Sequence, residues 1–161
     1  FLKLDTGVTG TLSTSNYVDS GKVLQIINST NNTNTASTTT SFADTGLTAT
    51  ITPSSSSSKV LVLVEHSFNT YASGNMVMKL NLLRDSTTII SENRLQYGTN
   101  SGTYFQNNYG THSMTILDNP SSSSSLIYKT QFKRSEYTGT PYACNVNTSG
   151  GSTITLMEIQ G

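Results

Sequence analysis

At 161 residues the chain has the length of a single domain. Its net charge is zero and only 11% of its residues are charged, so no electrostatic attraction to nucleic acid or to an anionic membrane is expected. The single cysteine, Cys144, excludes an intrachain disulfide framework, and no stretch approaches the ~20 apolar residues of a transmembrane helix. We therefore predict no nucleic-acid partner and no membrane insertion.

The first 20 residues differ from the rest of the chain. They hold few apolar side chains and the glycines Gly7 and Gly10, and such a segment cannot form a core of its own. The chain also begins with Phe1, which is typical of a processed product or of the C-terminal piece of a longer protein. We expect residues 1–20 to be an extended connector and residues 21–161 to be the head domain.

Strand signals begin after Lys22. Residues 23–27 are rich in Val, Leu and Ile and predict a first strand, which we expect to end in a polar loop from Asn28 onward. Residues 38–42 predict a second strand, and Asp44-Thr45-Gly46 has the composition of a turn. In residues 47–51 apolar side chains alternate with Thr, which is the period of a half-buried strand.

Two serine runs follow prolines, after Pro53 and after Pro120, and each leads directly into an apolar segment. Residues 60–64 are apolar on both faces, so that strand has to be covered from two sides. Residues 76–83 and 87–91 predict a hairpin that turns at residues 84–86.

The C-terminal half continues the pattern. Further strands are predicted around Met114, at residues 126–132, at 142–146 and at 154–159, which brings the total to about nine or ten with no amphipathic helix. The sequence therefore predicts an all-β fold, an antiparallel β-sandwich or jelly roll. Because residues 60–64 and 154–159 are apolar on both faces, we expect one outer face to pack on another subunit, through Val60, Val62, Val64, Met157 and Ile159.

No catalytic motif is present. The chain lacks a Gly-x-Ser-x-Gly elbow, and we expect its two histidines, His66 and His112, to be polar residues at strand ends. Five carboxylates are candidates for glycoside cleavage, but nothing in the sequence pairs any two of them: Glu65, Asp85, Glu92, Glu136 and Glu158. We expect Cys144 to be a small buried residue, and we predict no enzyme activity, no cofactor and no metal site.

Tyrosines in polar segments indicate recognition. Residues 93–112 are rich in Asn, Gly and Tyr, a mixture in which Tyr supplies a rigid amphipathic face and Asn supplies adaptable hydrogen bonds. The alternative is that these tyrosines pack beneath their own loops. We predict a receptor-binding surface in this segment, made by Tyr97, Tyr104, Tyr109, Asn107 and Asn108.

Several segments resemble a known family. The stretch from Leu2 to Leu12, the stretch from Asp44 to Val62 across the first serine run, the segments at 117–120 and 128–132, and the ending at 152–159 are similar to the C-terminal tip (knob) domains of bacteriophage tail fibres, particularly those of phages of marine bacteria. The resemblance implies a homotrimeric knob whose subunits are jelly rolls like tumour-necrosis-factor and complement heads. It also implies that residues 1–20 join the knob to a fibre shaft, and it carries over no catalytic residue.

On these grounds we expect a viral structural protein at the virion surface that attaches to a host-surface receptor, either a glycan or a protein. The alternatives are a capsid-decorating or fibre-capping module without receptor specificity, a depolymerase, and a secreted jelly-roll recognition protein. The last of these predicts glycosylation at Asn28, Asn31 or Asn147, each of which begins an Asn-x-Ser/Thr sequence.

Overall fold

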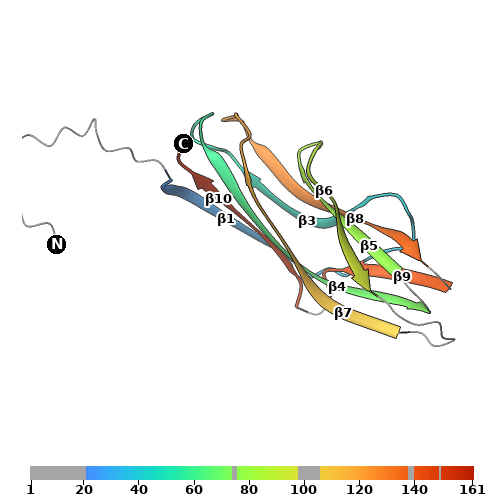
Figure 1. The fold of residues 1–161 in the computed structure, drawn as a ribbon. Helices are drawn as coiled ribbons and strands as arrows, with labels where there is room; N and C mark the ends of the chain where they lie inside the picture. Colours follow the sequence, from blue (N-terminus) through green and yellow to red (C-terminus); the bar gives the residue numbers. More distant parts are fainter. Residues whose placement is uncertain (1–20, 74–75, 98–105, 138–139, 149) are drawn as a thin grey trace, which may run out of the picture.

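The computed structural model describes residues 21–73, 76–97, 106–137, 140–148 and 150–161, and within them the regular elements are all strands. They form two antiparallel sheets that face each other (Figure 1). Sheet A contains β1 (Val23–Asn31), β10 (Ser152–Ile159), β4 (Lys59–Ser73), β7 (Gln106–Asp118), β9 (Thr140–Val146) and β2 (Thr35–Ser37). Sheet B contains β3 (Ala43–Ile51), β8 (Leu126–Tyr137), β5 (Met76–Arg84) and β6 (Thr87–Tyr97).

The connectivity is that of a jelly roll. Sheet A has the order β1-β10-β4-β7 and sheet B the order β3-β8-β5-β6, and the chain crosses between the sheets at most of its connections. The predicted antiparallel β-sandwich is therefore confirmed. The long strand β4 organises sheet A, because β7 pairs along nearly all of one edge while β10 and β9 share the other edge, one at each end of β4.

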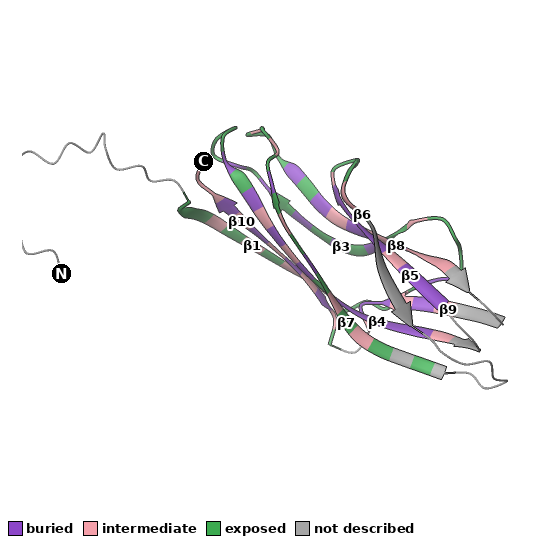
Figure 2. Cartoon of the chain, in the orientation of Figure 1, coloured by how far each residue is buried: buried purple, intermediate pink, exposed green. Residues whose placement is uncertain are grey.

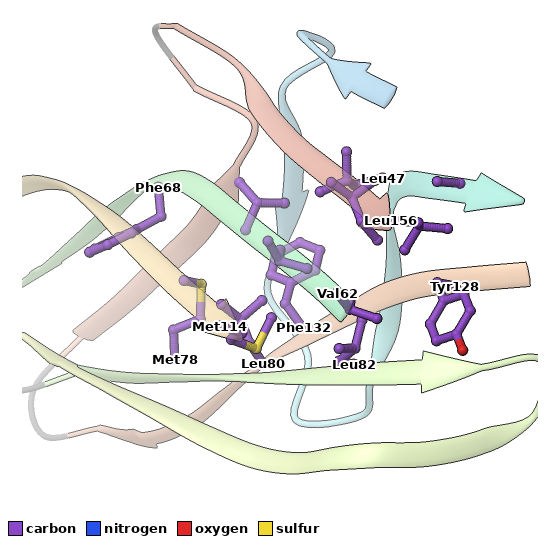
Figure 3. Packing of buried hydrophobic residues seen from close by; sticks show 14 of the residues in the cluster. Leu47, Val62, Phe68, Met78, Leu80, Leu82, Met114, Tyr128, Phe132 and Leu156 are labelled. Carbon is purple, nitrogen blue, oxygen red and sulfur yellow. The ribbon is translucent and has the colours of Figure 1, made fainter. Parts of the chain in front are cut away.

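The core lies between the two sheets and is built from alternate residues of each strand. Figure 2 shows buried positions alternating with more exposed ones along β8, as expected for a strand covered on one face. Val62 and Leu156 of sheet A meet Leu82 and Phe132 of sheet B in this layer (Figure 3). Tyr128 also lies there, and its hydroxyl donates a 2.6 Å hydrogen bond to Asp118 Oδ2 on β7.

Most predicted strands are confirmed. In β3 the side chains of Leu47, Ala49 and Ile51 are buried while the intervening threonines are exposed, as the alternation indicates. The predicted hairpin is formed by β5 and β6. Its turn contains Asp85 with a φ of 52°, which is the left-handed geometry that two-residue hairpin turns require.

Four sequence predictions were wrong. Residues 38–42 form no strand but link β2 to β3, and the supposed turn at 44–46 lies inside β3, where the pairing with β8 shifts register. The first strand continues to Asn31 and does not end at Asn28, because its Asn, Ser and Thr residues pair with β10. His66 is not at a strand end either, since it lies within β4 with its side chain fully buried.

Candidate functional site

The outer face of sheet A carries a row of exposed apolar side chains at one end. Ile26 pairs with Met157, Met157 pairs with Leu61, and Leu61 pairs with Leu117, so the four side chains cross β1, β10, β4 and β7 in a line. Ile26 is 58% exposed and Leu117 is 52% exposed. We call these four residues the apolar row.

Further apolar surface continues the row toward the end of the sheet. Val23 and Leu24 are exposed beside Ile159, which is half-buried and pairs with Val23. Isolated exposed apolar residues are ordinary on protein surfaces, but a contiguous set across four strands is typical of an interaction site.

The predicted interface residues divide between the two faces of sheet A. Met157 and Ile159 lie on the outer face, as predicted, but Val60, Val62 and Val64 are at most 2% exposed and belong to the core of the single chain. The prediction for these three valines was therefore wrong. Residues 60–64 are apolar at every position, so the sequence does not indicate which alternate set points inward, and the pairing with β10 and β7 decides it.

The other half of the same face is polar and hollowed. A depression of about 610 Å3 lies over the paired residues Tyr109, Asn69 and Asn145 of β7, β4 and β9. Its remaining lining comes from the β1–β2 and β9–β10 connections: Asn32, Asn34, Thr148, Gly150 and Gly151. We call this depression the asparagine basin. A second depression of about 500 Å3 adjoins it, sharing Tyr109 and Thr148 and adding Ser67, Phe68, Gly110 and Thr111.

Hydrogen bonds fix the amides on the floor of the basin. Asn145 Nδ2 donates to Asn69 Oδ1 at 3.1 Å, and Asn69 Nδ2 donates to Asn107 Oδ1 at 3.3 Å. These two consecutive hydrogen bonds orient three neighbouring side-chain amides in the same direction across the sheet. Each amide keeps further donor or acceptor capacity, because an amide can make four hydrogen bonds.

Asn147 holds the two connections that form the rim. It is fully buried with a φ of 56°, and its Nδ2 donates to Thr45 O at 2.7 Å and to Thr33 O at 3.2 Å. Its backbone nitrogen donates to Ser67 O at 2.9 Å. Gly151, with a φ of 72°, lets the Asn32 side chain lie against the backbone, since a Cβ there would come within 1.9 Å of Asn32 Oδ1.

One of the predicted receptor residues lines the basin, and a second is hydrogen-bonded to a residue that lines it. Tyr109 is 66% exposed and lines it, and Asn107 is exposed and bonded to Asn69. Tyr104 lies outside the described residues. Tyr97 belongs to β6 of sheet B, and the side chains of Tyr97 and Asn108 are also outside the described part of the chain. Four asparagines of the basin were not predicted from the sequence, although the Asn-rich segment after Asn28 was an available signal: Asn32, Asn34, Asn69 and Asn145.

A buried carboxylate supports the sheet beneath the apolar row. Glu158 is 1% exposed; its Oε1 accepts hydrogen bonds from the Ser54 nitrogen and hydroxyl, and its Oε2 accepts one from Gln25 Nε2 at 2.6 Å. Burial alone raises the pKa of Glu158, but these hydrogen bonds outweigh it and lower the pKa to about 2. Ser54 of the first serine run therefore stabilises the buried carboxylate of Glu158.

The two histidines form a cross-strand pair on the inner side of sheet A. His66 pairs with His112 in the β4–β7 register, and its ring nitrogens are bonded to Ser152 Oγ at 3.0 Å and Thr130 Oγ1 at 2.8 Å. Thr130 Oγ1 in turn lies 2.6 Å from Thr45 Oγ1, so the network joins the two sheets. Burial, and then the charge of His112, lower the pKa of His66 to about 4.

The described carboxylate candidates are not paired. Glu65 lies exposed on the outer face of β4, Glu158 is buried on the inner face of β10, and Asp85 is in the β5–β6 turn of the other sheet. The side chains of Glu92 and Glu136 are not described. In the part of the chain that the structure covers, no group of three His, Cys, Asp or Glu residues is placed to hold a metal ion. Among those same residues no helix is long and apolar enough to cross a membrane.

Comparison with solved structures gives a distant likeness. No family model matches the chain, and no curated protein matches it. A similar solved structure is a chain of the T13 IBDV viral particle, with 16% sequence identity and a TM-score of 0.49. The match covers 97% of this chain and 35% of that chain, so this chain spans about a third of that protein's length. A likeness of this size carries no argument about function.

Proposed function

We propose that the chain is the self-assembling head of a viral fibre, which sits at the virion surface and attaches the particle to a receptor on the host. The jelly-roll fold and the sequence resemblance to fibre-tip domains support the viral structural role. The assembly is a homotrimer, and residues 1–20 connect it to a shaft or to other virion proteins. The proposal includes no catalytic step and no cofactor.

The observation that carries the assembly is the apolar row. Ile26 and Leu117 are more than half exposed in the single chain. A second copy that covers them stabilises the assembly by roughly 25 cal/mol for each Å2 of apolar surface removed from water. The row crosses the whole width of sheet A from β1 to β7, so a neighbouring subunit can pack on it over four strands. Self-association of this kind also supplements a core built from a chain with only 34% hydrophobic residues.

Three linked heads also make attachment effective with weak individual sites, because multivalency raises avidity by about 10² to 10⁴ over a single site. The polar half of the outer face of sheet A is the part of that face available for receptor binding. A fibre-capping module without receptor specificity uses the same apolar row and differs only in lacking a ligand.

A competition experiment tests attachment directly. Purified chain added to the host cells should reduce adsorption of the virus that carries it, and a variant with both Ile26→Ser and Leu117→Ser should compete less well because it is not multivalent. If a saturating concentration of the intact trimer does not reduce adsorption of the virus, the attachment function is contradicted and only the fibre-capping role remains.

A further inference from the structure

We propose that the asparagine basin is a binding site for a neutral saccharide of two or three sugar units. The inference rests on the proposed attachment function for its biological role, but its chemistry follows from the residues that line the basin. The basin and the depression beside it, at about 610 and 500 Å3, have the size range of small-ligand sites.

The hydrogen-bonding groups of the basin match those of a sugar. Every hydroxyl of a saccharide is both a donor and an acceptor, and a side-chain amide offers both functions on one planar group. Asn32, Asn34, Asn69 and Asn145 line the basin together, and the bonds through Asn69 hold two of these amides in fixed orientations. Fixed amides lose little conformational freedom on binding, which favours a ligand with many hydroxyls.

Tyr109 provides the apolar element of the site. It is 66% exposed, stands on the outer face of β7 directly across from Asn69, and lines both depressions. An exposed tyrosine ring beside a polar floor offers a flat face for the C–H side of a sugar, while the amides take its hydroxyls. An aromatic face combined with planar amides favours a saccharide over a peptide with bulky apolar side chains.

The charge around the basin selects a neutral ligand. Its lining contains no Lys or Arg and no carboxylate. Glu65 lines a smaller depression of about 250 Å3 that shares Gly150 and Gly151 with the basin. An anionic sugar would lose hydration without gaining a cation and would face a carboxylate, so sialylated and sulfated saccharides are disfavoured.

The basin is far enough from the apolar row to stay open in the assembled head. Leu61 and Asn69 lie eight positions apart on β4, which corresponds to roughly 26 Å at the rise of a strand. A subunit that packs over the row therefore leaves the polar half of the face accessible. Binding is expected in both the assembled chain and the double variant Ile26→Ser/Leu117→Ser.

Nuclear magnetic resonance of the full chain tests the site. Maltotriose, lactose and triacetylchitotriose serve as neutral probes, and 3′-sialyllactose and a sulfated chondroitin disaccharide serve as anionic probes. At least one neutral probe should shift the side-chain amide signals of Asn69 and Asn145. Tyr109→Ala should weaken that binding by about tenfold, as expected for loss of an aromatic anchor, while Tyr109→Phe stays within about threefold. Asn28→Ala, an exposed asparagine of the same face outside the basin, is the matched control and should bind as the unaltered chain does.

Each other outcome overturns the inference. Preference for the anionic probes, shifts confined to other surfaces, an equal loss in Asn28→Ala, or no shift with any neutral probe would each exclude a neutral-saccharide site. These outcomes differ from failure of the proposed function. If the basin binds sugar but the chain does not compete for host cells, the attachment function is excluded and the saccharide site is retained. If the chain competes and Tyr109→Ala competes equally well, the basin is excluded as the receptor site and the attachment function is retained.

Discussion

Two hydrogen bonds join Glu158 to Ser54, one from the Ser54 backbone nitrogen at 2.7 Å and one from its hydroxyl at 2.6 Å, both to Oε1 of the buried carboxylate. A third, from Gln25 Nε2, reaches Oε2. These described partners are all neutral, and their hydrogen bonds stabilise the negative charge. Glu158 thereby ties the first serine run and β1 to the end of β10.

Replacing Glu158 by Gln should destabilise the fold. The amide puts an N–H group against one of the donors and removes the charge that strengthens the remaining hydrogen bonds, so we expect a loss of about 2 kcal/mol in the free energy of unfolding. Urea unfolding at pH 7 measures it. Glu65→Gln, at an exposed position on the same sheet, is the control and should change stability by less than about 0.5 kcal/mol. Equal effects of the two substitutions would contradict the assigned role.

The same carboxylate makes stability depend on acid. Because the pKa of Glu158 is about 2 in the fold and 4.5 as a free side chain, the unfolded chain takes up a proton first as the pH falls. The stabilisation is complete above pH 4.5 and is lost between pH 4.5 and 2. Between pH 4.5 and 2 the free energy of unfolding should fall more steeply with pH in the unaltered chain than in Glu158→Gln. Parallel pH dependences in the two proteins would contradict this role of Glu158.

His66 acts in a higher window. Its pKa is lowered from 6.5 to about 4 by burial and by the neighbouring His112, so the fold disfavours the protonated ring. Stability is unaffected above pH 6.5 and falls as the pH drops toward 4, by up to roughly 3 kcal/mol. In His66→Gln this slope should become shallower, whatever the absolute stability of the variant, and the part that remains belongs to His112, whose pKa burial also lowers, and below pH 4.5 to Glu158. An undiminished slope between pH 6.5 and 4 in that variant would assign the effect to other groups.

Asp118 joins the two sheets through Tyr128 and Arg84. Its Oδ2 accepts from the Tyr128 hydroxyl and from Arg84 Nη1, each at 2.6 Å. Tyr128→Phe keeps the buried ring and removes only the hydroxyl, so we expect a loss of about 1.5 kcal/mol in unfolding free energy. In a double-mutant cycle with Asp118→Asn, the two losses should be less than additive, whereas strict additivity would show that the contact contributes nothing.

The Asn-x-Ser/Thr sequences should differ in their accessibility. Asn147 is fully buried and its Nδ2 donates to two backbone carbonyls, so it cannot carry a glycan in the folded chain, whereas Asn28 is exposed. If the chain is expressed in a secretory pathway, mass spectrometry of its peptides should find Asn147 unmodified. Occupancy at Asn147 in folded protein would contradict the packing of this loop.

The alternation of apolar and polar residues predicted most strands correctly, because it reflects burial of one face of each strand. The alternation in residues 47–51 matches β3, and the hairpin of β5 and β6 follows from its turn residues. Predictions based on polarity alone were less successful. Residues 28–31 are polar yet extend β1, because a neighbouring strand satisfies their backbone groups.

The candidate site was harder to predict because it is assembled from distant segments. Asn32, Asn69, Tyr109 and Asn145 meet only after β4 pairs with both β7 and β9 and the β1–β2 connection folds over them. Only Tyr109 and Asn107 lay in a segment whose composition indicates recognition. The interface prediction placed Val60, Val62 and Val64 on the wrong face of β4, since a strand that is apolar at every position does not indicate which side chains point inward.

The native mass of the full chain, measured by light scattering, tests the central claim that the outer face of sheet A is an assembly surface. The account predicts a mass three times the 17.3 kDa of one chain, and a monomer for the double variant Ile26→Ser/Leu117→Ser. Ile127→Ser is the matched control, because Ile127 is 45% exposed but lies on β8 of the other sheet, and it should remain trimeric. A monomeric unaltered chain, or a trimer that only Ile127→Ser dissociates, would contradict the account.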